Sequence, residues 1–126
     1  MRKTVLLLAL TLLVVLLASA VALAATIVGT DKDETLIGTR YADYIRAGGG
    51  ADEVKGKDGP DQLYGNAGKD RLHGGYGDDM IFSGDIFSQS GAYRDVVDCG
   101  HGHDFASVDY KDRVRANCEV VQVGAV

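Results

Sequence analysis

Between Gly29 and Phe82, an aliphatic residue returns at every ninth position and an acidic residue stands two positions before it. The aliphatic column is Leu36, Ile45, Val54, Leu63, Leu72 and Ile81. The acidic column is Glu34, Asp43, Asp52, Asp61, Asp70 and Asp79. Most neighbours of the aliphatic residues are polar, as in a short strand with one buried face. The pattern predicts six short strands, each preceded by a six-residue turn.

Glycine marks these turns. The first position of each nine-residue unit is glycine except at Ala47, and the fourth is glycine from the third unit onward. Glycines at the first, second and fourth positions permit positive φ and hence a tight turn. Two strands and two turns close a coil of eighteen residues, so alternate units stack on the same side. We expect an all-β, right-handed parallel β-roll of about four two-repeat coils over residues 25–107.

The period is interrupted after Phe82. A seventh unit begins at Ser83, but its acid, Asp95, comes seven residues late, which predicts a surface insertion near residues 86–94. The register returns in an eighth unit, whose acid is Asp104. Residues 108–126 have no nine-residue period and alternate apolar with polar side chains, so we expect them to form a C-terminal capping segment.

The consensus of the units, G-G-x-G-x-D-x-aliphatic-x, resembles the RTX (haemolysin-type) calcium-binding nonapeptide repeat, which forms a parallel β-helix. The resemblance implies that the sixth-position acids bind Ca²⁺ between the turns of adjacent coils. The ligands expected on this basis are Glu34, which departs from the usual aspartate, Asp43, Asp52, Asp61, Asp70, Asp79, Asp95 and Asp104. Turn carbonyls are expected to complete the sites, which adds Gly48, Gly50, Gly59, Gly68, Gly75 and Gly77.

Pockets lined only by oxygen suit calcium, which accepts six to eight flexible oxygen ligands, better than magnesium. Plain turns or a disordered polar linker without metal are the alternative. A disordered linker would have no reason to keep the acid and the aliphatic residue in register through six copies.

The N-terminus has the features of a signal peptide over residues 1–24: a basic start, an apolar run from Val5 to Leu17, and a small-x-small site before Ala25. An uncleaved membrane anchor is the alternative. Both place the repeats outside the cytoplasm, and cleavage gives a secreted protein with no membrane insertion.

The whole chain has a formal net charge of −5, and loss of Arg2 and Lys3 with the signal peptide would lower it to −7. This balance disfavours nucleic acids and anionic membranes as partners and favours cations. The chain also has no tryptophan and only three phenylalanines, so it has few large side chains for an apolar core.

Cys99 and Cys118 are the only cysteines, and in an exported protein they are expected to form a disulfide. Free thiols serving catalysis or metal binding are the alternative. His101 and His103 raise the possibility of a zinc or copper site, but no third nitrogen or sulfur ligand is evident.

No G-x-S-x-G or H-E-x-x-H motif is present, so we do not expect an enzyme. The sequence favours a secreted module with a structural or interaction role that folds on binding several Ca²⁺ ions. An adhesive or ice-binding surface is a second hypothesis; it would need a ladder of threonine or aromatic side chains, and only Thr30 and Thr39 align. A small hydrolase using His101 with Ser107 is a third.

Overall fold

The computed structural model describes residue 3, residues 24–84 and residues 93–124. The expected signal peptide or membrane anchor and most of the expected insertion therefore lie outside the described residues. In the described part, no helix is both long and apolar enough to cross a membrane. The strands are β1 (Thr26–Val28), β2 (Thr35–Ile37), β3 (Tyr44–Gly49), β4 (Glu53–Asp58), β5 (Gln62–Ala67), β6 (Arg71–Tyr76), β7 (Met80–Phe82), β8 (Val96–His101), β9 (Phe105–Val108), β10 (Arg113–Val114) and β11 (Val120–Val123).

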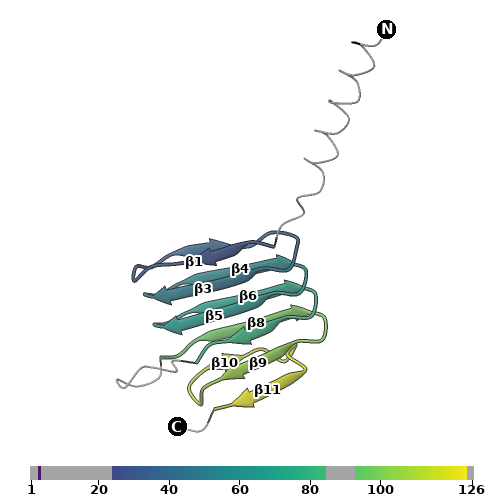
Figure 1. Ribbon diagram of the computed structural model, residues 1–126. Helices are drawn as coiled ribbons and strands as arrows, with labels where there is room; N and C mark the ends of the chain where they lie inside the picture. Colours follow the sequence, from purple (N-terminus) through teal and green to yellow (C-terminus); the bar gives the residue numbers. More distant parts are fainter. Residues whose placement is uncertain (1–2, 4–23, 85–92, 125–126) are drawn as a thin grey trace.

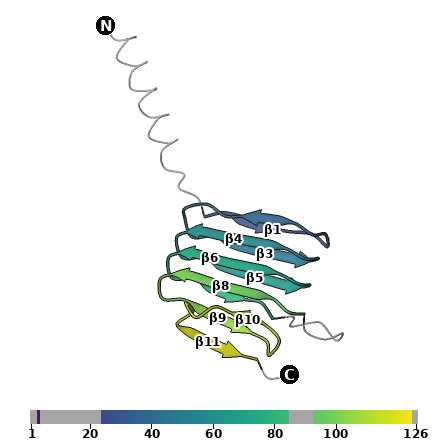
Figure 2. The same cartoon turned by 180° about the vertical axis from the view of Figure 1, so that it is seen from behind.

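The strands form two parallel sheets that face each other, as Figures 1 and 2 show from opposite sides. One sheet has the order β1-β3-β5-β7-β9-β11, and we call it the odd-strand sheet. The other has the order β10-β8-β6-β4-β2 and is the even-strand sheet. Consecutive strands alternate between the sheets, so two units make one coil. The all-β parallel solenoid predicted from the repeats is confirmed.

The stack has about five coils, one more than expected, because strands are added at both ends. At the N-terminal end, β1 precedes the first unit and pairs with β3. At the C-terminal end, β10 pairs with β8 and β11 pairs with β9, both in parallel. The segment expected as a cap therefore closes the stack by continuing it. The spacing between successive aliphatic residues shortens here to eight, from Ala106 to Val114, and then to seven, from Val114 to Val121. These units therefore do not follow the nine-residue period.

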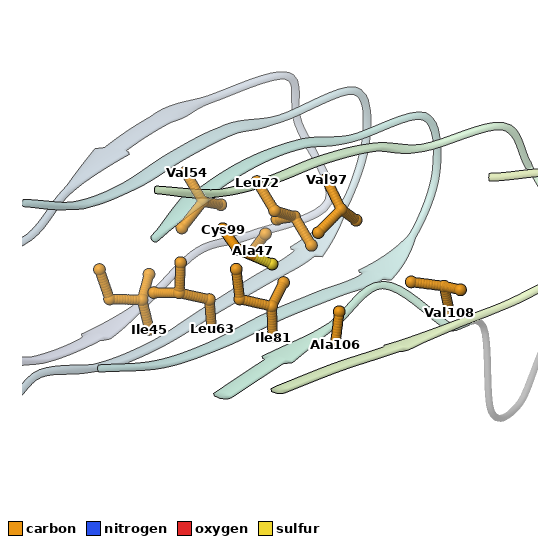
Figure 3. Packing of buried hydrophobic residues seen from close by; sticks show 10 residues of the cluster. All are labelled: Ile45, Ala47, Val54, Leu63, Leu72, Ile81, Val97, Cys99, Ala106 and Val108. Atoms are coloured by element: carbon orange, nitrogen blue, oxygen red, sulfur yellow. The ribbon is translucent and has the colours of Figure 1, made fainter. Parts of the chain in front are cut away.

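The aliphatic columns of the two sheets meet in a narrow core (Figure 3). The side chains of Ile45, Leu63 and Ile81 in the odd-strand sheet are fully buried, as are those of the even-strand sheet's Val54, Leu72 and Val97. Each strand from β3 to β9 contributes one aliphatic residue of the repeat to this core, and β3, β8 and β9 add only Ala47, Cys99 and Val108. The turns that join the strands must therefore be held by other interactions.

Candidate metal sites

The sixth-position acids stack in two rows along the solenoid, one at each side. The even row consists of Asp43, Asp61, Asp79, Asp104 and Glu119. The odd row consists of Glu34, Asp52, Asp70, Asp95 and Asp112. At each step, the backbone N–H of one acid donates to a carboxylate oxygen of the next acid in its row. The N–H of Asp61, for example, donates to Oδ1 of Asp79 at 2.8 Å. The rows thus tie each coil to the next.

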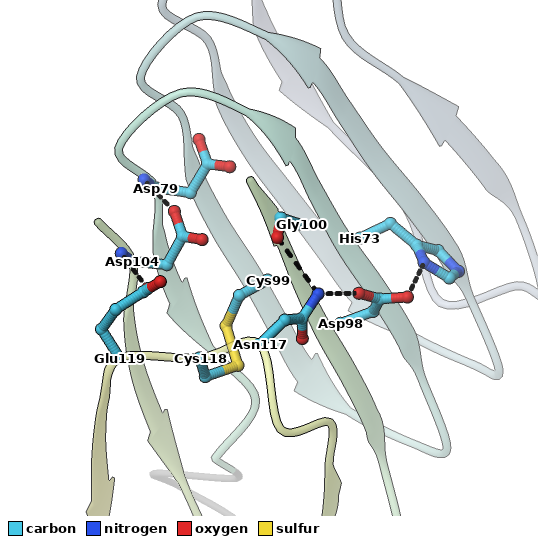
Figure 4. The surroundings of a disulfide bond; sticks show 9 residues. All are labelled: His73, Asp79, Asp98, Cys99, Gly100, Asp104, Asn117, Cys118 and Glu119. Carbon is cyan, nitrogen blue, oxygen red and sulfur yellow. Dashed lines mark hydrogen bonds and ion pairs between the residues drawn. A yellow bond between two sulfur atoms is a disulfide. The ribbon is translucent and has the colours of Figure 1, made fainter. Parts of the chain in front are cut away.

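The last member of each row was missed in the sequence. The N–H of Asp95 donates to Oδ1 of Asp112 at 3.0 Å. Figure 4 shows the other step, in which the N–H of Asp104 donates to Oε2 of Glu119 at 2.8 Å. Both acids stand two positions before an aliphatic residue, Val114 or Val121. This spacing is the signal that could have identified them without the glycines.

Seven turns are named by their place in the repeat. They are the first (29–34), second (38–43), third (47–52), fourth (56–61), fifth (65–70) and sixth (74–79) turns, and the turn of the eighth unit (99–104) is the eighth turn. The first, third and fifth turns stack on the odd row. The second, fourth, sixth and eighth turns stack on the even row.

Burial perturbs these carboxyl groups. Asp61, Asp79 and Asp104 are each 1% exposed. Desolvation, with a smaller contribution from neighbouring acids in the row, raises the pKa of Asp79 to about 7 and that of Asp61 to about 6. Desolvation likewise raises the pKa of Asp52 and Asp104. The rows therefore hold negative charge at a cost that a bound cation would offset.

The second carboxylate oxygen distinguishes the early turns from the later ones. In the first turn, the N–H of Thr30 donates to Oε2 of Glu34 at 2.6 Å. In the second, the N–H of Thr39 donates to Oδ2 of Asp43. The corresponding oxygen is buried and accepts no hydrogen bond in the later turns at Asp52, Asp61, Asp79 and Asp104. The third, fourth, sixth and eighth turns therefore present an unsatisfied oxygen atom, and the first two turns do not.

Backbone conformation also distinguishes the first two turns from the later ones. In the later turns the second and fourth positions have positive φ, and they are occupied by Gly48, Gly50, Lys57, Gly59, Asn66, Gly68, Gly75, Gly77, Gly100 and Gly102. The first and second turns have no residue of positive φ. Glycine is also needed for stacking, because a Cβ atom on Gly77 would collide with the carbonyl oxygen of Gly59 in the turn above. All six glycines assigned to the sites from the sequence thus lie in turns of the later kind.

The glycines of the first position have a different role from the one expected. None of them has positive φ. A Cβ atom on Gly74 would instead meet Oδ2 of Asp79, and one on Gly65 would lie 2.8 Å from Oδ2 of Asp70. The small residue makes room for the buried carboxylate of its own unit.

The donors fit calcium. No group of three or more His, Cys, Asp and Glu side chains is placed to hold a metal ion within the described ranges. The second to sixth turns and the eighth turn each supply one buried carboxylate, and backbone carbonyl oxygens of the turns can supply further ligands for an ion. Such an oxygen-only set suits calcium and not zinc. His101 and His103 are exposed, and the ring of His101 stacks on Tyr76 at 4.8 Å between centroids.

The expected disulfide between Cys99 and Cys118 is present (Figure 4). It joins the first position of the eighth unit to the last turn, with 5.2 Å between the Cα atoms. Beside it, Nδ2 of Asn117 donates to Oδ1 of Asp98 at 2.7 Å and to the carbonyl of Gly100 at 3.2 Å. These contacts fasten the shortened C-terminal units to the stack.

Comparison with known proteins supports this description. Two overlapping segments, residues 28–63 and 55–85, match the family model of the RTX calcium-binding nonapeptide repeat. Neither the curated proteins nor the solved structures include a significant match. The matched region contains the first six turns and their acids. The two acid rows, the paired left-handed turn positions and this match identify residues 28–85 of the chain as RTX calcium-binding nonapeptide repeats.

Proposed function

We propose that this protein is an extracellular calcium-dependent β-roll that folds when Ca²⁺ binds in its later turns and then serves as a structural or interaction module. The observation that carries the proposal is the buried, unpartnered carboxylate oxygen that recurs at Asp52, Asp61, Asp79 and Asp104. Four such atoms in one small domain are costly unless a cation satisfies them.

The division between the turns also gives a number of ions. An ion held between stacked turns needs two neighbours that both have left-handed residues at the second and fourth positions. Among the turns that the structure describes, three pairs meet this condition: the third with the fifth turn, the fourth with the sixth, and the sixth with the eighth. We therefore expect three calcium ions per chain.

Calcium supplies positive charge and accepts oxygen ligands from both members of a pair. Each ion contributes RT ln(1 + [Ca²⁺]/Kd), which is about 1.4 kcal/mol at tenfold excess over Kd. Three ions then contribute about 4 kcal/mol, a large share of the 5–15 kcal/mol that is typical of a folded domain. We expect the metal-free chain to be largely unfolded at neutral pH.

Far-ultraviolet circular dichroism of the chain lacking residues 1–24 tests this. Addition of millimolar calcium should convert a disordered spectrum into a β-rich one, and excess chelator should reverse it. Identical spectra in calcium and in chelator would rule out calcium-dependent folding.

A non-enzymatic role is part of the proposal. His101 lies at the end of β8 in the even-strand sheet, and Ser107 lies in β9 of the odd-strand sheet, which does not favour the pair as a hydrolase site. An esterase and peptidase screen of the calcium-loaded protein should be negative. The disulfide and the RTX repeats favour an extracellular location.

A further inference from the structure

The outer face of the odd-strand sheet carries a nearly uncharged set of side chains, which we call the aromatic face. Strand register aligns one column as Thr26, Tyr44, Gln62, Met80, Phe105 and Val120. It aligns a second column as Val28, Arg46, Tyr64, Phe82, Ser107 and Gln122. Arg46 is the only charged residue among the twelve.

Four rings of this face form a continuous row across β3, β5, β7 and β9. The ring centroids of Tyr44 and Tyr64 are 5.3 Å apart. Those of Tyr64 and Phe82 are stacked at 4.8 Å, and those of Phe82 and Phe105 are 6.1 Å apart. The four rings are half-buried against one another, and Met80 beside them is 50% exposed. These rings form an aromatic ladder. The sequence did not reveal it because its members come from every second unit.

The outer face of the even-strand sheet is different. Its columns are Thr35, Glu53, Arg71, Val96 and Arg113, and Ile37, Lys55, His73 and Asp98. Its charges pair with one another, as Lys55 does with Glu53 at 3.1 Å. Both faces cover the same core and have the same strand spacing. The core therefore does not require the aromatic composition of the odd-strand face.

The size of the aromatic face limits what can cover it. Six strands about 4.8 Å apart, each about 10 Å long, make a strip on the order of 250 Å². Two copies pressed together would bury on the order of 500 Å², well below the roughly 1,200 Å² of a stable protein interface. The strip is narrow and long, so it fits one extended polymer chain lying across the strands.

The chemistry of the strip narrows the choice of polymer. A sugar ring has an apolar C–H face that packs flat on an aromatic ring, and hydroxyl groups at its edge. The face supplies one ring on each of β3, β5, β7 and β9, with neutral hydrogen-bonding groups on the same or the next strand of the sheet at Gln62, Ser107 and Gln122. A mostly apolar surface with a few placed polar groups is typical of ligand sites. With one cation and no carboxylate, the face offers no charge match to an acidic polymer.

We propose that the aromatic face binds a linear neutral polysaccharide, with successive sugar rings packed along the row from Tyr44 to Phe105. The proposal rests on the fold and on the register of the odd-strand sheet. It does not depend on the number of calcium ions.

The test uses calcium-loaded protein with β-1,4-linked glucose and N-acetylglucosamine hexasaccharides, followed by tyrosine fluorescence and by nuclear magnetic resonance. Binding of at least one of them with Kd below about 1 mM is expected. Tyr64→Ala should weaken it at least tenfold, and Tyr64→Phe, which keeps the ring, should stay within threefold. The matched control is His73→Ala, which lies on the outer face of the other sheet and should not change binding.

Circular dichroism in calcium shows that each variant is folded. Failure of the wild-type protein to bind either hexasaccharide would overturn the proposal. So would equal binding by Tyr64→Ala, or tighter binding to heparin or to phosphatidylcholine vesicles than to the neutral sugars.

Discussion

The first two turns and the later turns all carry an acid at the sixth position of the repeat, but the hydrogen bonding of that acid differs between them. In the first two, the acid accepts hydrogen bonds from its own turn, as Glu34 does from Thr30 and Asp43 from Thr39. In the later turns, left-handed residues at the second and fourth positions change the path of the backbone. One carboxylate oxygen then has no donor at Asp52, Asp61, Asp79 and Asp104. A turn without its glycines can thus close without metal. A turn with them leaves an oxygen atom for a cation.

Among the substitutions, Gly77→Ala should have the largest effect on calcium binding and stability. The alanine would be strained at φ 127°, and its Cβ would collide with the backbone of the fourth turn. Because the sixth turn belongs to two of the three expected pairs, we expect loss of two calcium ions and of more than about 3 kcal/mol of stability. Calorimetric calcium titration and thermal unfolding measure both. Gly124→Ala is the control, since its Cβ would lie 3.6 Å from the nearest heavy atom, an ordinary contact.

The stability of the metal-free fold should change with pH by on the order of 3 kcal/mol. The pKa values of Asp61 and Asp79 are raised in the fold to about 6 and about 7, so their protonated forms stabilise it. The metal-free fold should be most stable below the ordinary carboxyl pKa near 4 and lose stability as the pH rises through 6 to 7.

In chelator, far-ultraviolet circular dichroism should therefore show a larger folded fraction at pH 5 than at pH 8. In saturating calcium the melting temperature should instead be higher at pH 8, because protons compete with the ion. A folded fraction in chelator that rises between pH 5 and pH 8 would contradict the assigned burial of these acids.

Matched substitutions of one acid from each kind of turn give a smaller effect. Asp79→Asn should weaken calcium binding at least tenfold and yet stabilise the metal-free fold by about 1 kcal/mol, since it removes a buried charge. Asp43→Asn should leave calcium affinity within about twofold and cost about 1 kcal/mol with or without calcium, because its oxygens accept from Thr39 and Ala25. Equal losses of calcium affinity in the two variants would remove the distinction between the turns.

Glu34→Gln should have the smallest effect. The amide oxygen can still accept the hydrogen bond from Thr30, so stability should change by less than about 1 kcal/mol. Calcium stoichiometry should be unchanged. A lost ion in this variant would show that the first turn binds calcium after all.

The sequence predicted the solenoid, the buried columns and the disulfide because each depends on a spacing that repeats. The fourth-position glycines, which begin only in the third unit, favoured the later turns as the better calcium sites. They did not predict the cause of the difference, which is whether the backbone at Thr30 or at Gly48 brings an N–H group to the carboxylate. Asp112 and Glu119 were missed because shortened turns shift the period while the acid keeps its distance from the next aliphatic residue. The row of Tyr44, Tyr64, Phe82 and Phe105 was missed because its members come from alternate units and from two columns.

The central claim is that only stacked pairs of later turns hold calcium. Isothermal titration calorimetry of the metal-free chain with calcium tests it most directly, because it counts the ions. We expect three calcium ions per chain. Six, one for every stacked pair among the eight units, would show that the first two turns bind as well as the later ones, and none would show that the unsatisfied carboxylates are not calcium ligands.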